Sequence, residues 1–194
     1  MESWHDYVTS MSAGLRDVAV TGNGGAPLTP SDGFERWVAM THAAHMGGQS
    51  VFLIGNGASA ALASHFAADA CKNGGLRARA FDDPSLLAAT GNDETFGQVF
   101  ALPLARFGQP GDVLISISSS GRSPNILRAL EQARAMQLRI VTLSGRGSDN
   151  PSRSFGDVSF YVPCDRYGWI ESAHQVILHY WLDRYLNVHG RGAV

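Results

Sequence analysis

The sequence predicts an α/β fold in which a parallel, doubly wound sheet is flanked by helices. Three observations predict it. From residue 50 onward, short apolar runs of strand length alternate with longer segments whose apolar residues recur at helical spacing. The first run, Ser50–Ile54, is continuously apolar after its serine and is followed by a glycine, which is typical of a strand buried on both faces. Glycine accounts for 22 of the 194 residues, an excess that indicates tight turns or backbone close to a ligand.

Residues 1–49 precede this alternation and are predicted to form two helices. The first covers residues 3–19, where apolar side chains recur at helical spacing. A loop rich in glycine, proline and asparagine follows over residues 20–30. The second helix begins near Ser31–Asp32, which we interpret as its cap, and stops at the glycines 47–48. Because both helices lie outside the alternation, they are candidates for an interface between subunits.

The remaining residues, 50–194, are predicted to form the α/β core. The strands expected there are Ser50–Ile54, Arg79–Phe81, Asp112–Ile117, Arg139–Leu143 and Asp157–Val162. The helices expected there are Ser59–Cys71, Pro124–Met136 and Ile170–Leu186. Strands that alternate with helices form a parallel sheet through right-handed crossovers. We therefore interpret residues 1–194 as one domain, a five-stranded core with an N-terminal helical extension.

Composition excludes several classes of protein. Fifteen basic and 17 acidic residues give a net charge of −2, so we expect no nucleic-acid partner and no membrane surface. No apolar run approaches the ~20 residues of a membrane span, and residues 1–12 lack a signal pattern. The two cysteines have no CxxC spacing, which argues against a disulfide scaffold and favours a reduced, cytoplasmic protein. Charged residues are only 16 % of the chain, which indicates that part of the surface is buried in an oligomer.

Two loops rich in glycine and serine follow two of the predicted strands. One comprises Gly55, Asn56, Gly57, Ala58 and Ser59; the other comprises Ser118, Ser119, Ser120, Gly121, Arg122 and Ser123. Ligands bind to such sheets at the carboxyl ends of the strands. Ser123 stands where an N-cap belongs and Pro124 at the first helical position, so a helix N-terminus is expected to face the ligand. Hydroxyl groups and free N–H groups without added charge favour a phosphate monoester, although such residues also form ordinary turns.

The first loop also fits the spacing G-x-G-x-x-A, which is a loose dinucleotide fingerprint. That interpretation needs an acidic residue ~20 positions further on to hold a ribose. Asp82 and Asp83 lie too far along the chain for this, and the fingerprint leaves the second serine loop unexplained. The phosphate interpretation is therefore favoured over the dinucleotide one.

Histidines and carboxylates recur on two predicted helices. His65 and Asp69 are four residues apart and therefore share a helix face. Glu171 and His179 lie on the last helix, where a straight helix separates them by ~12 Å along its axis. One metal ion cannot take both from one regular helix, so the helix start is irregular or one ligand comes from a neighbouring subunit. His174 is expected to pack in the interior.

These motifs resemble the SIS (sugar isomerase) family. The resemblance rests on GNGAS, SHF followed by an acidic residue, GND, SISSSGRSPN and a closing helix with Glu and His, and it covers nearly the whole chain. Within the family the chain is similar to the phosphoheptose isomerases. The resemblance implies a flavodoxin-like sheet, a homotetramer with active sites between subunits, and conversion of sedoheptulose 7-phosphate to D-glycero-D-manno-heptose 7-phosphate.

The resemblance also implies roles for particular residues. Phosphate would be held by Ser118, Ser119, Ser120 and Ser123, helped by Ser59 in its loop with Gly57 and Ala58, and the sugar would meet Asn56, Asn92, Asp93 and Glu171. Asp69 and His179 would be the catalytic acid and base, and zinc would be bound by His65, Asp69, Glu171 and His179. Three departures from the family stand out: Asp69 replaces a glutamate, Glu171 replaces a glutamine, and an arginine near Asn73 is absent, with Lys72 beside that position.

Two other functions remain open from the sequence. Some SIS proteins bind phosphosugars or act in replication initiation without catalysing a reaction, and an isomerase of this kind can take another ketose phosphate. A regulator would usually carry a DNA-binding helix-turn-helix, and none is evident in residues 1–49. A non-catalytic protein would also have less reason to keep four candidate acid, base and metal-binding residues together. An isomerase is therefore favoured.

Overall fold

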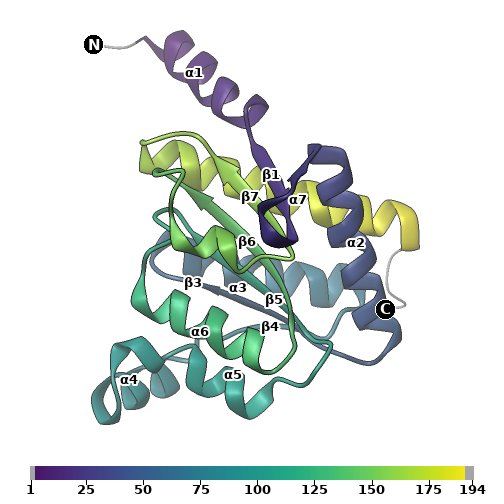
Figure 1. Ribbon diagram of the computed structural model, residues 1–194, viewed down its shortest axis with the longest axis vertical. Coiled ribbons are helices and arrows are strands. Elements are labelled where there is room, and N and C mark those ends of the chain that lie inside the picture. The colour runs from purple at the N-terminus through teal and green to yellow at the C-terminus, as the bar shows by residue number, and fades with distance from the viewer. Residues whose placement is uncertain (1–2, 191–194) are drawn as a thin grey trace.

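The computed structural model describes residues 3–190, which form one mixed sheet between two layers of helices (Figure 1). The sheet has seven strands in the order β2-β1-β7-β6-β5-β3-β4. Its parallel part consists of β3 (Val51–Gly55), β4 (Ala78–Ala80), β5 (Val113–Ser118), β6 (Arg139–Gly145) and β7 (Val158–Val162). Numbered among themselves, these strands follow the order 2-1-3-4-5, which is the flavodoxin-like order. All five strands predicted from the sequence are confirmed.

The prediction of a loop over residues 20–30 is wrong, and the sheet therefore has seven strands instead of five. Strands β1 (Ala19–Gly22) and β2 (Pro27–Leu28) form a hairpin around a short 3-10 turn, η1 (Asn23–Gly25). Strand β1 pairs antiparallel with β7, so that Val20 lies opposite Phe160 and is buried. The edge of β7 supplies the hydrogen bonds that stabilise this short strand, and local composition carries no sign of that distant partner.

The helices agree with the sequence where apolar periodicity is long, and two short ones were not predicted. The observed helices are α1 (Trp4–Arg16), α2 (Pro30–Met46), α3 (Ala58–Gly74), α4 (Pro84–Asp93), α5 (Ala101–Phe107), α6 (Pro124–Ala135) and α7 (Tyr167–His189), with 3-10 turns η2 (Phe96–Gln98) and η3 (Pro151–Ser154). The N-cap of α2 is Thr29, two residues before the expected cap, because the Thr29 side chain accepts a hydrogen bond from the backbone N–H of Asp32 at 3.1 Å.

Alternate residues of the central strands point into two separate cores. On β3, Leu53 belongs to the core beneath α2, α3 and α7, whereas Phe52 and Ile54 belong to the core beneath α5 and α6. Helix α2 is an integral part of the first core, because the indole rings of Trp37 and Trp181 stack with their centroids 4.7 Å apart. The boundary between an extension (1–49) and a core (50–194) stays a prediction.

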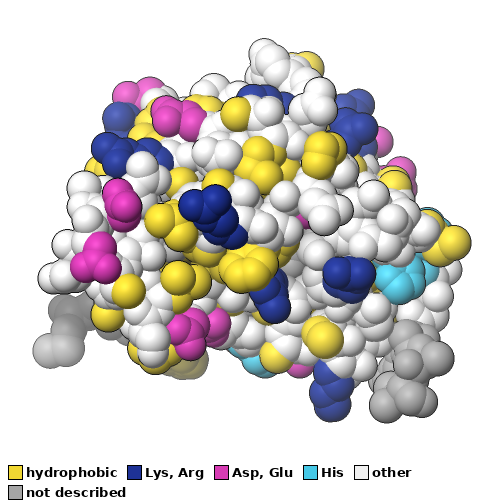
Figure 2. All heavy atoms as spheres, turned by 90° about the horizontal axis from the view of Figure 1, so that it is seen from below, with side chains coloured by type: hydrophobic (Ala, Val, Ile, Leu, Met, Phe, Trp, Pro, Cys, Tyr) yellow, Lys and Arg dark blue, Asp and Glu magenta, His cyan; other side chains and the backbone are white. Residues whose placement is uncertain are grey.

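Helix α1 differs from the other helices in its packing. It has no buried residue, the Trp4 side chain is 79 % exposed, and Figure 1 shows the helix extending away from the body of the molecule. Residues 3–190 contain no helix whose length and hydropathy would let it cross a lipid bilayer. On the face shown in Figure 2, basic and acidic side chains are scattered among apolar ones and form no continuous patch of one sign.

Candidate active site

The two predicted loops meet at the carboxyl ends of β3 and β5. They share a cavity of about 170 Å³ with the first turn of α7, which we call the serine-loop cavity. Its lining residues are Asn56, Ser59, Ile117, Ser118, Ser119, Ser120, Ser123, Tyr167 and Glu171. Among these residues, Glu171 carries the one charged side chain. A cavity lined by hydroxyl and amide groups at this edge of a parallel sheet is where folds of this kind bind polar ligands.

Glycines shape the loop that follows β3. Gly57 is the N-cap of α3 and has a φ of 57°, a conformation that side chains rarely adopt. A Cβ at Gly55 would lie 2.5 Å from the carbonyl oxygen of Ser59, so the turn is too tight for any other residue. This turn brings Ser59 into the cavity. Gly57 and Ala58 are exposed and do not line it.

The loop that follows β5 is held by its own backbone and hydroxyl groups. The hydroxyl of Ser118 accepts from the N–H of Gly121 at 3.2 Å, and that of Ser120 accepts from the N–H of Arg122 at 3.3 Å. Ser123 is the N-cap of α6, as predicted, but its side chain makes no capping hydrogen bond. Its hydroxyl and the positive end of the helix dipole therefore remain available to an anion in the cavity.

Asn125 joins the two loops, and sequence reasoning missed it. Its buried side-chain amide donates to Oδ1 of Asn56 at 2.8 Å, and the amide of Asn56 donates back to Oδ1 of Asn125 at 3.0 Å. Oδ1 of Asn125 also accepts from the N–H of Ile126 at 3.0 Å. The signal in the sequence is an asparagine just inside the helix that follows the serine loop, but its partner lies 69 residues away and cannot be read from the pattern.

We expect Asn56→Ala and Asn125→Ala to be coupled. Each single variant removes both hydrogen bonds between the two side chains and leaves the NH₂ group of the remaining asparagine without this partner, which costs about 1–3 kcal/mol of unfolding free energy. The double variant should lose less unfolding free energy than the two single variants lose together. We expect a coupling energy of about 1–2 kcal/mol, measured by urea unfolding. The exposed Asn92→Ala is the matched control and should shift stability by less than about 0.5 kcal/mol. Strict additivity of the two single variants would contradict the coupling.

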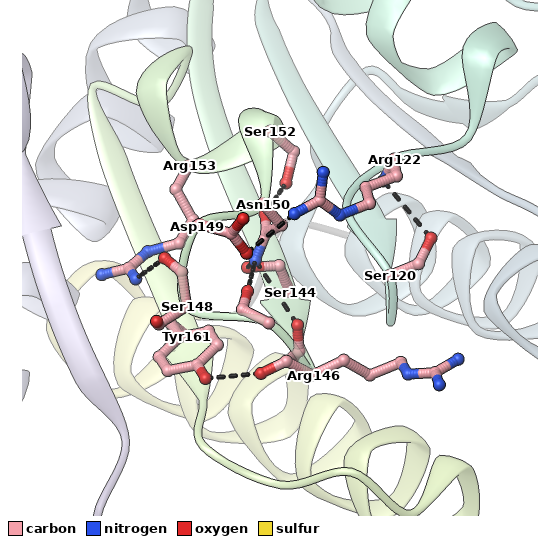
Figure 3. Close-up of polar contacts among 12 residues, drawn as sticks. Ser120, Arg122, Ser144, Arg146, Ser148, Asp149, Asn150, Ser152, Arg153 and Tyr161 are labelled. Atoms are coloured by element: carbon pink, nitrogen blue, oxygen red, sulfur yellow. Dashed lines mark hydrogen bonds and ion pairs between the residues drawn. The ribbon is translucent and has the colours of Figure 1, made fainter.

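A second polar network, formed by the loop after β6, supports the serine loop of residues 118–123 (Figure 3). The side-chain amide of Asn150 donates to the hydroxyl of Ser144 at 3.3 Å and to the carbonyl of Gly147 at 2.9 Å. The hydroxyl of Ser152 donates to Oδ1 of Asn150 at 2.8 Å, and the backbone N–H of Ser152 donates to the carbonyl of Gly121 at 3.2 Å. The loop after β6 therefore fixes the position of the loop after β5.

The predicted acid, base and metal-binding residues lie on the paired helices α3 and α7. Nε2 of His65 and Oδ2 of Asp69 are 3.4 Å apart, as expected for one helix face. The imidazole rings of His65 and His179 lie with their centroids 6.0 Å apart, and His179 also packs edge-on against Phe66. His65, Asp69 and His179 thus form one cluster, in which the side chains of His65 and Asp69 are 51 % and 30 % exposed.

Glu171 does not join this cluster. Helix α7 runs without interruption from Tyr167 to His189, so Glu171 and His179 remain ~12 Å apart along its axis. Glu171 instead lines the serine-loop cavity. Within residues 3–190, no three His, Cys, Asp or Glu side chains are placed to hold one metal ion. A single chain therefore does not assemble the expected ligand set, and the first of the two explanations, an irregular start of the helix, is wrong.

Asn92 and Asp93 also lie outside the cavity. They occupy the last turn of α4, where the side-chain amide of Asn92 donates to Oδ1 of Asp93 at 2.7 Å. Both residues are exposed, and neither lines the serine-loop cavity. The structure therefore does not bring this pair to the other predicted sugar-binding residues within one chain.

His174 is buried beneath the site, as the sequence indicates. Its Nε2 lies 3.3 Å from the carbonyl oxygen of Ser144, and its Nδ1 is buried without a partner among the described residues. Desolvation lowers the pKa of His174 from 6.5 to about 4, and the hydrogen bond to Ser144 opposes this only in part. The ring therefore stays neutral at neutral pH and fixes the end of β6 against α7.

This histidine predicts a pH-dependent stability. In the unfolded chain it takes up a proton as the pH falls below 6.5, whereas in the folded chain it does so only near pH 4. Its contribution is therefore complete above pH 6.5 and is lost as the pH falls toward 4, by about 3 kcal/mol in total and about 2 kcal/mol at pH 5. Urea unfolding at pH 7.5 and pH 5 measures it. The variant His174→Met should lose most of this pH dependence, and an equal slope in both proteins would contradict the assignment.

The fold and the hydroxyl-lined cavity define the class of protein. The family model described as SIS domain matches residues 28–145, and the chain belongs to the SIS domain family. Within that family it is similar to the phosphoheptose isomerases. A phosphoheptose isomerase from Azoarcus sp. (strain BH72) is 38 % identical over 150 residues, which is 73 % of this chain and 76 % of that protein.

Solved structures agree with this relationship. The phosphoheptose isomerase GmhA from Neisseria gonorrhoeae superposes with a TM-score of 0.74 at 33 % identity, covering 79 % of this chain and 86 % of that one. A phosphoheptose isomerase from Francisella tularensis superposes with a TM-score of 0.82 at 26 % identity, covering 94 % of this chain and 96 % of that one.

Proposed function

We propose that this protein is a phosphosugar isomerase that converts sedoheptulose 7-phosphate to D-glycero-D-manno-heptose 7-phosphate. The observation that carries the proposal is the cavity shared by the two loops, from which α3 leads to the cluster of His65, Asp69 and His179. The relatives named phosphoheptose isomerase support the choice of a seven-carbon substrate.

The phosphate is proposed to bind in the serine-loop cavity. Hydroxyl groups and the N-terminus of α6 hold the phosphate oxygens, with Ser118, Ser119, Ser120, Ser123 and Ser59 as the hydroxyl donors. Asn56 and Glu171 in the cavity, the backbone at Gly57 and Ala58, and Asn92 and Asp93 from α4 complete the proposed substrate contacts. Binding energy from this remote group positions the sugar for the chemical step.

The proposed chemistry is a proton transfer between neighbouring carbons. A base removes a proton from the carbon beside the carbonyl group, which gives an enediolate, and a proton is returned to the neighbouring carbon. Asp69 and His179 are the proposed acid and base. Both are exposed or half-buried in one chain, so they are accessible to a substrate. The Asp69 carboxylate lies about one methylene further back than the glutamate it replaces.

We propose that the assembled oligomer, and not a single chain, binds a divalent ion. The available donors favour zinc. Two imidazoles and carboxylates are the donors that suit zinc, but Glu171 is too far from His65, Asp69 and His179 in one chain to complete the set. A neighbouring copy that supplies the missing ligand would complete it, and a bound ion would then stabilise the developing oxyanion. Elemental analysis of protein purified without added metal tests this. No stoichiometric metal, with activity unaffected by a chelator, would contradict it.

The protein is further proposed to be a cytoplasmic homotetramer. Helix α1 exposes Trp4, and Val176 and Tyr180 expose apolar surface on α7 beside a cavity of about 280 Å³. Apolar surface of this kind is commonly covered in an oligomer. Cys71 and Cys164 are unpaired, as expected in a reducing compartment. Sedimentation measures the assembly, and a monomer at micromolar concentration would contradict it.

The decisive experiment is a comparison of substrates. Purified protein is assayed with sedoheptulose 7-phosphate beside five- and six-carbon ketose phosphates. We expect kcat/KM for the heptose to be at least about tenfold higher, as the relatives named phosphoheptose isomerase suggest. A higher kcat/KM for another ketose phosphate would identify that compound as the substrate in place of the heptose. Binding of sedoheptulose 7-phosphate without turnover would favour a non-catalytic phosphosugar-binding protein, which the shortened Asp69 also favours.

A further inference from the structure

Arg146 is an exposed arginine held in a left-handed backbone conformation at the carboxyl end of β6. Its φ is 57°, and Gln137 is the one other non-glycine residue with positive φ among residues 3–190. Gln137 lies just after the C-cap of α6, where this conformation is a common way to end a helix. Arg146 instead follows a strand on the side of the sheet where ligands bind. Strained residues of this kind persist where the surrounding structure fixes them, and they cluster at ligand sites.

Two hydrogen bonds fix the backbone of Arg146. Its N–H donates to the carbonyl of Cys164 at 2.9 Å, and its carbonyl accepts from the hydroxyl of Tyr161 at 2.6 Å. In Figure 3 the side chain extends away from Tyr161, toward the part of the view that holds Ser120. The strained backbone therefore sets the direction of a long side chain.

The guanidinium group of Arg146 reaches a residue that lines the serine-loop cavity. Its carbon lies 4.9 Å from the ring centroid of Tyr167, and Nη1 donates to the Tyr167 hydroxyl at 2.9 Å. Tyr167 lies in the same cavity as Glu171, one turn before it on α7. Arg146 thus holds a ring at the edge of the proposed phosphate site.

The two neighbouring arginines, Arg122 and Arg153, contact groups that do not line the cavity. Arg122 is paired with Asp149 at 2.7 Å, and Arg153 stacks over Tyr161 and donates to the carbonyl of Ser148. Within the described part of the chain, Arg146 has no carboxylate at ion-pair distance. The cavity itself contributes the negative charge of Glu171 and no positive charge. A dianionic phosphate there needs a nearby cation to offset that carboxylate.

We propose that Arg146 is a positioning and specificity residue for the phosphorylated end of the substrate. It holds Tyr167 at the cavity and supplies a positive charge, which the residues lining the cavity do not provide. The inference rests on the proposed phosphate site. It further implies that the left-handed conformation at residue 146 is retained at a cost in stability for the sake of binding.

The variant Arg146→Gly separates binding from stability, because glycine relieves the backbone strain and removes the guanidinium group. Gln137→Gly is the matched control, since it relieves the same strain far from the cavity. We expect Gln137→Gly to raise Tm by about 1–3 °C, and Arg146→Gly to raise it by less, because this variant also loses the contact with Tyr167. Only Arg146→Gly should raise KM for sedoheptulose 7-phosphate and the inhibition constant of inorganic phosphate, each about tenfold, with kcat within about twofold. Arg146→Lys should restore part of the phosphate affinity, because it keeps the charge.

Calorimetry with inorganic phosphate measures binding without turnover and separates the two proposals. Equal phosphate affinity in the wild-type protein and in Arg146→Gly would overturn the role of Arg146 and leave the isomerase intact. A KM increase of equal size in Gln137→Gly would overturn it as well. Wild-type protein that neither binds phosphate nor converts sedoheptulose 7-phosphate would overturn the proposed function, and this inference with it.

Discussion

The variant His179→Gln is expected to lower kcat for sedoheptulose 7-phosphate by about 10²- to 10⁴-fold, which is the usual contribution of a general acid or base. Glutamine keeps the approximate size and a hydrogen-bonding end but cannot exchange a proton near neutral pH. KM should change little, because the phosphate is proposed to bind in the serine-loop cavity at the other end of the site. Steady-state kinetics over a range of substrate concentrations measures both constants.

Two further variants make this prediction specific. Asp69→Asn should show a loss of similar size, and the double variant should lose little more than either single one, because residues that act as a unit are not additive. His45→Gln changes an exposed histidine on α2 and serves as the control. Because His179 is exposed, its replacement should shift Tm by no more than about 2 °C. Turnover like that of the wild type in both single variants would remove these residues from the chemistry.

The parallel part of the fold could be predicted because each strand carries its own signal. Strand β3 is buried on both faces and is therefore apolar throughout, as is most of β5. The β1–β2 hairpin carries no such signal, since its stability comes from pairing with β7 and from the burial of Val20. Helices α4 and α5 were also missed, because they are short and have few buried residues from which a periodicity can be recognised.

The two loops of the site could be predicted from the sequence, but the side chains that other elements contribute to it could not. Serines, glycines and the Ser123–Pro124 helix start lie next to one another in the sequence, so their meeting at the sheet edge follows from topology alone. Asn125, Asn150 and Tyr167 contribute through partners on other elements, which no local pattern shows. The position of Glu171 depends on how straight α7 is, and that is decided by the packing of the whole helix.

Gly121→Ala is expected to have the largest effect on the architecture of the site. A Cβ at this position would lie 2.1 Å from Oδ1 of Asn150 and 2.6 Å from the hydroxyl of Ser152, and φ at Gly121 is +60°. Alanine must therefore displace the side chain of Asn150, which donates hydrogen bonds to Ser144 and Gly147. This displacement disrupts the network that supports the serine loop. We expect a loss of about 2–4 kcal/mol in unfolding free energy and a rise in KM of at least about tenfold.

Two comparisons separate the steric clash from the backbone strain in this variant. Gly48 has a φ of +74°, and a Cβ there would meet no atom within 4 Å, so Gly48→Ala isolates the strain and should cost only about 1 kcal/mol, with KM unchanged. Asn150→Ala combined with Gly121→Ala removes the nearer of the two clashing groups and leaves only the Ser152 hydroxyl. The double variant should therefore be more stable than the sum of the single variants predicts. If Gly121→Ala lowers the unfolding free energy no more than Gly48→Ala does and leaves KM unchanged, the Asn150 side chain can move aside without cost. The loop after β6 would then not be what fixes the phosphate site.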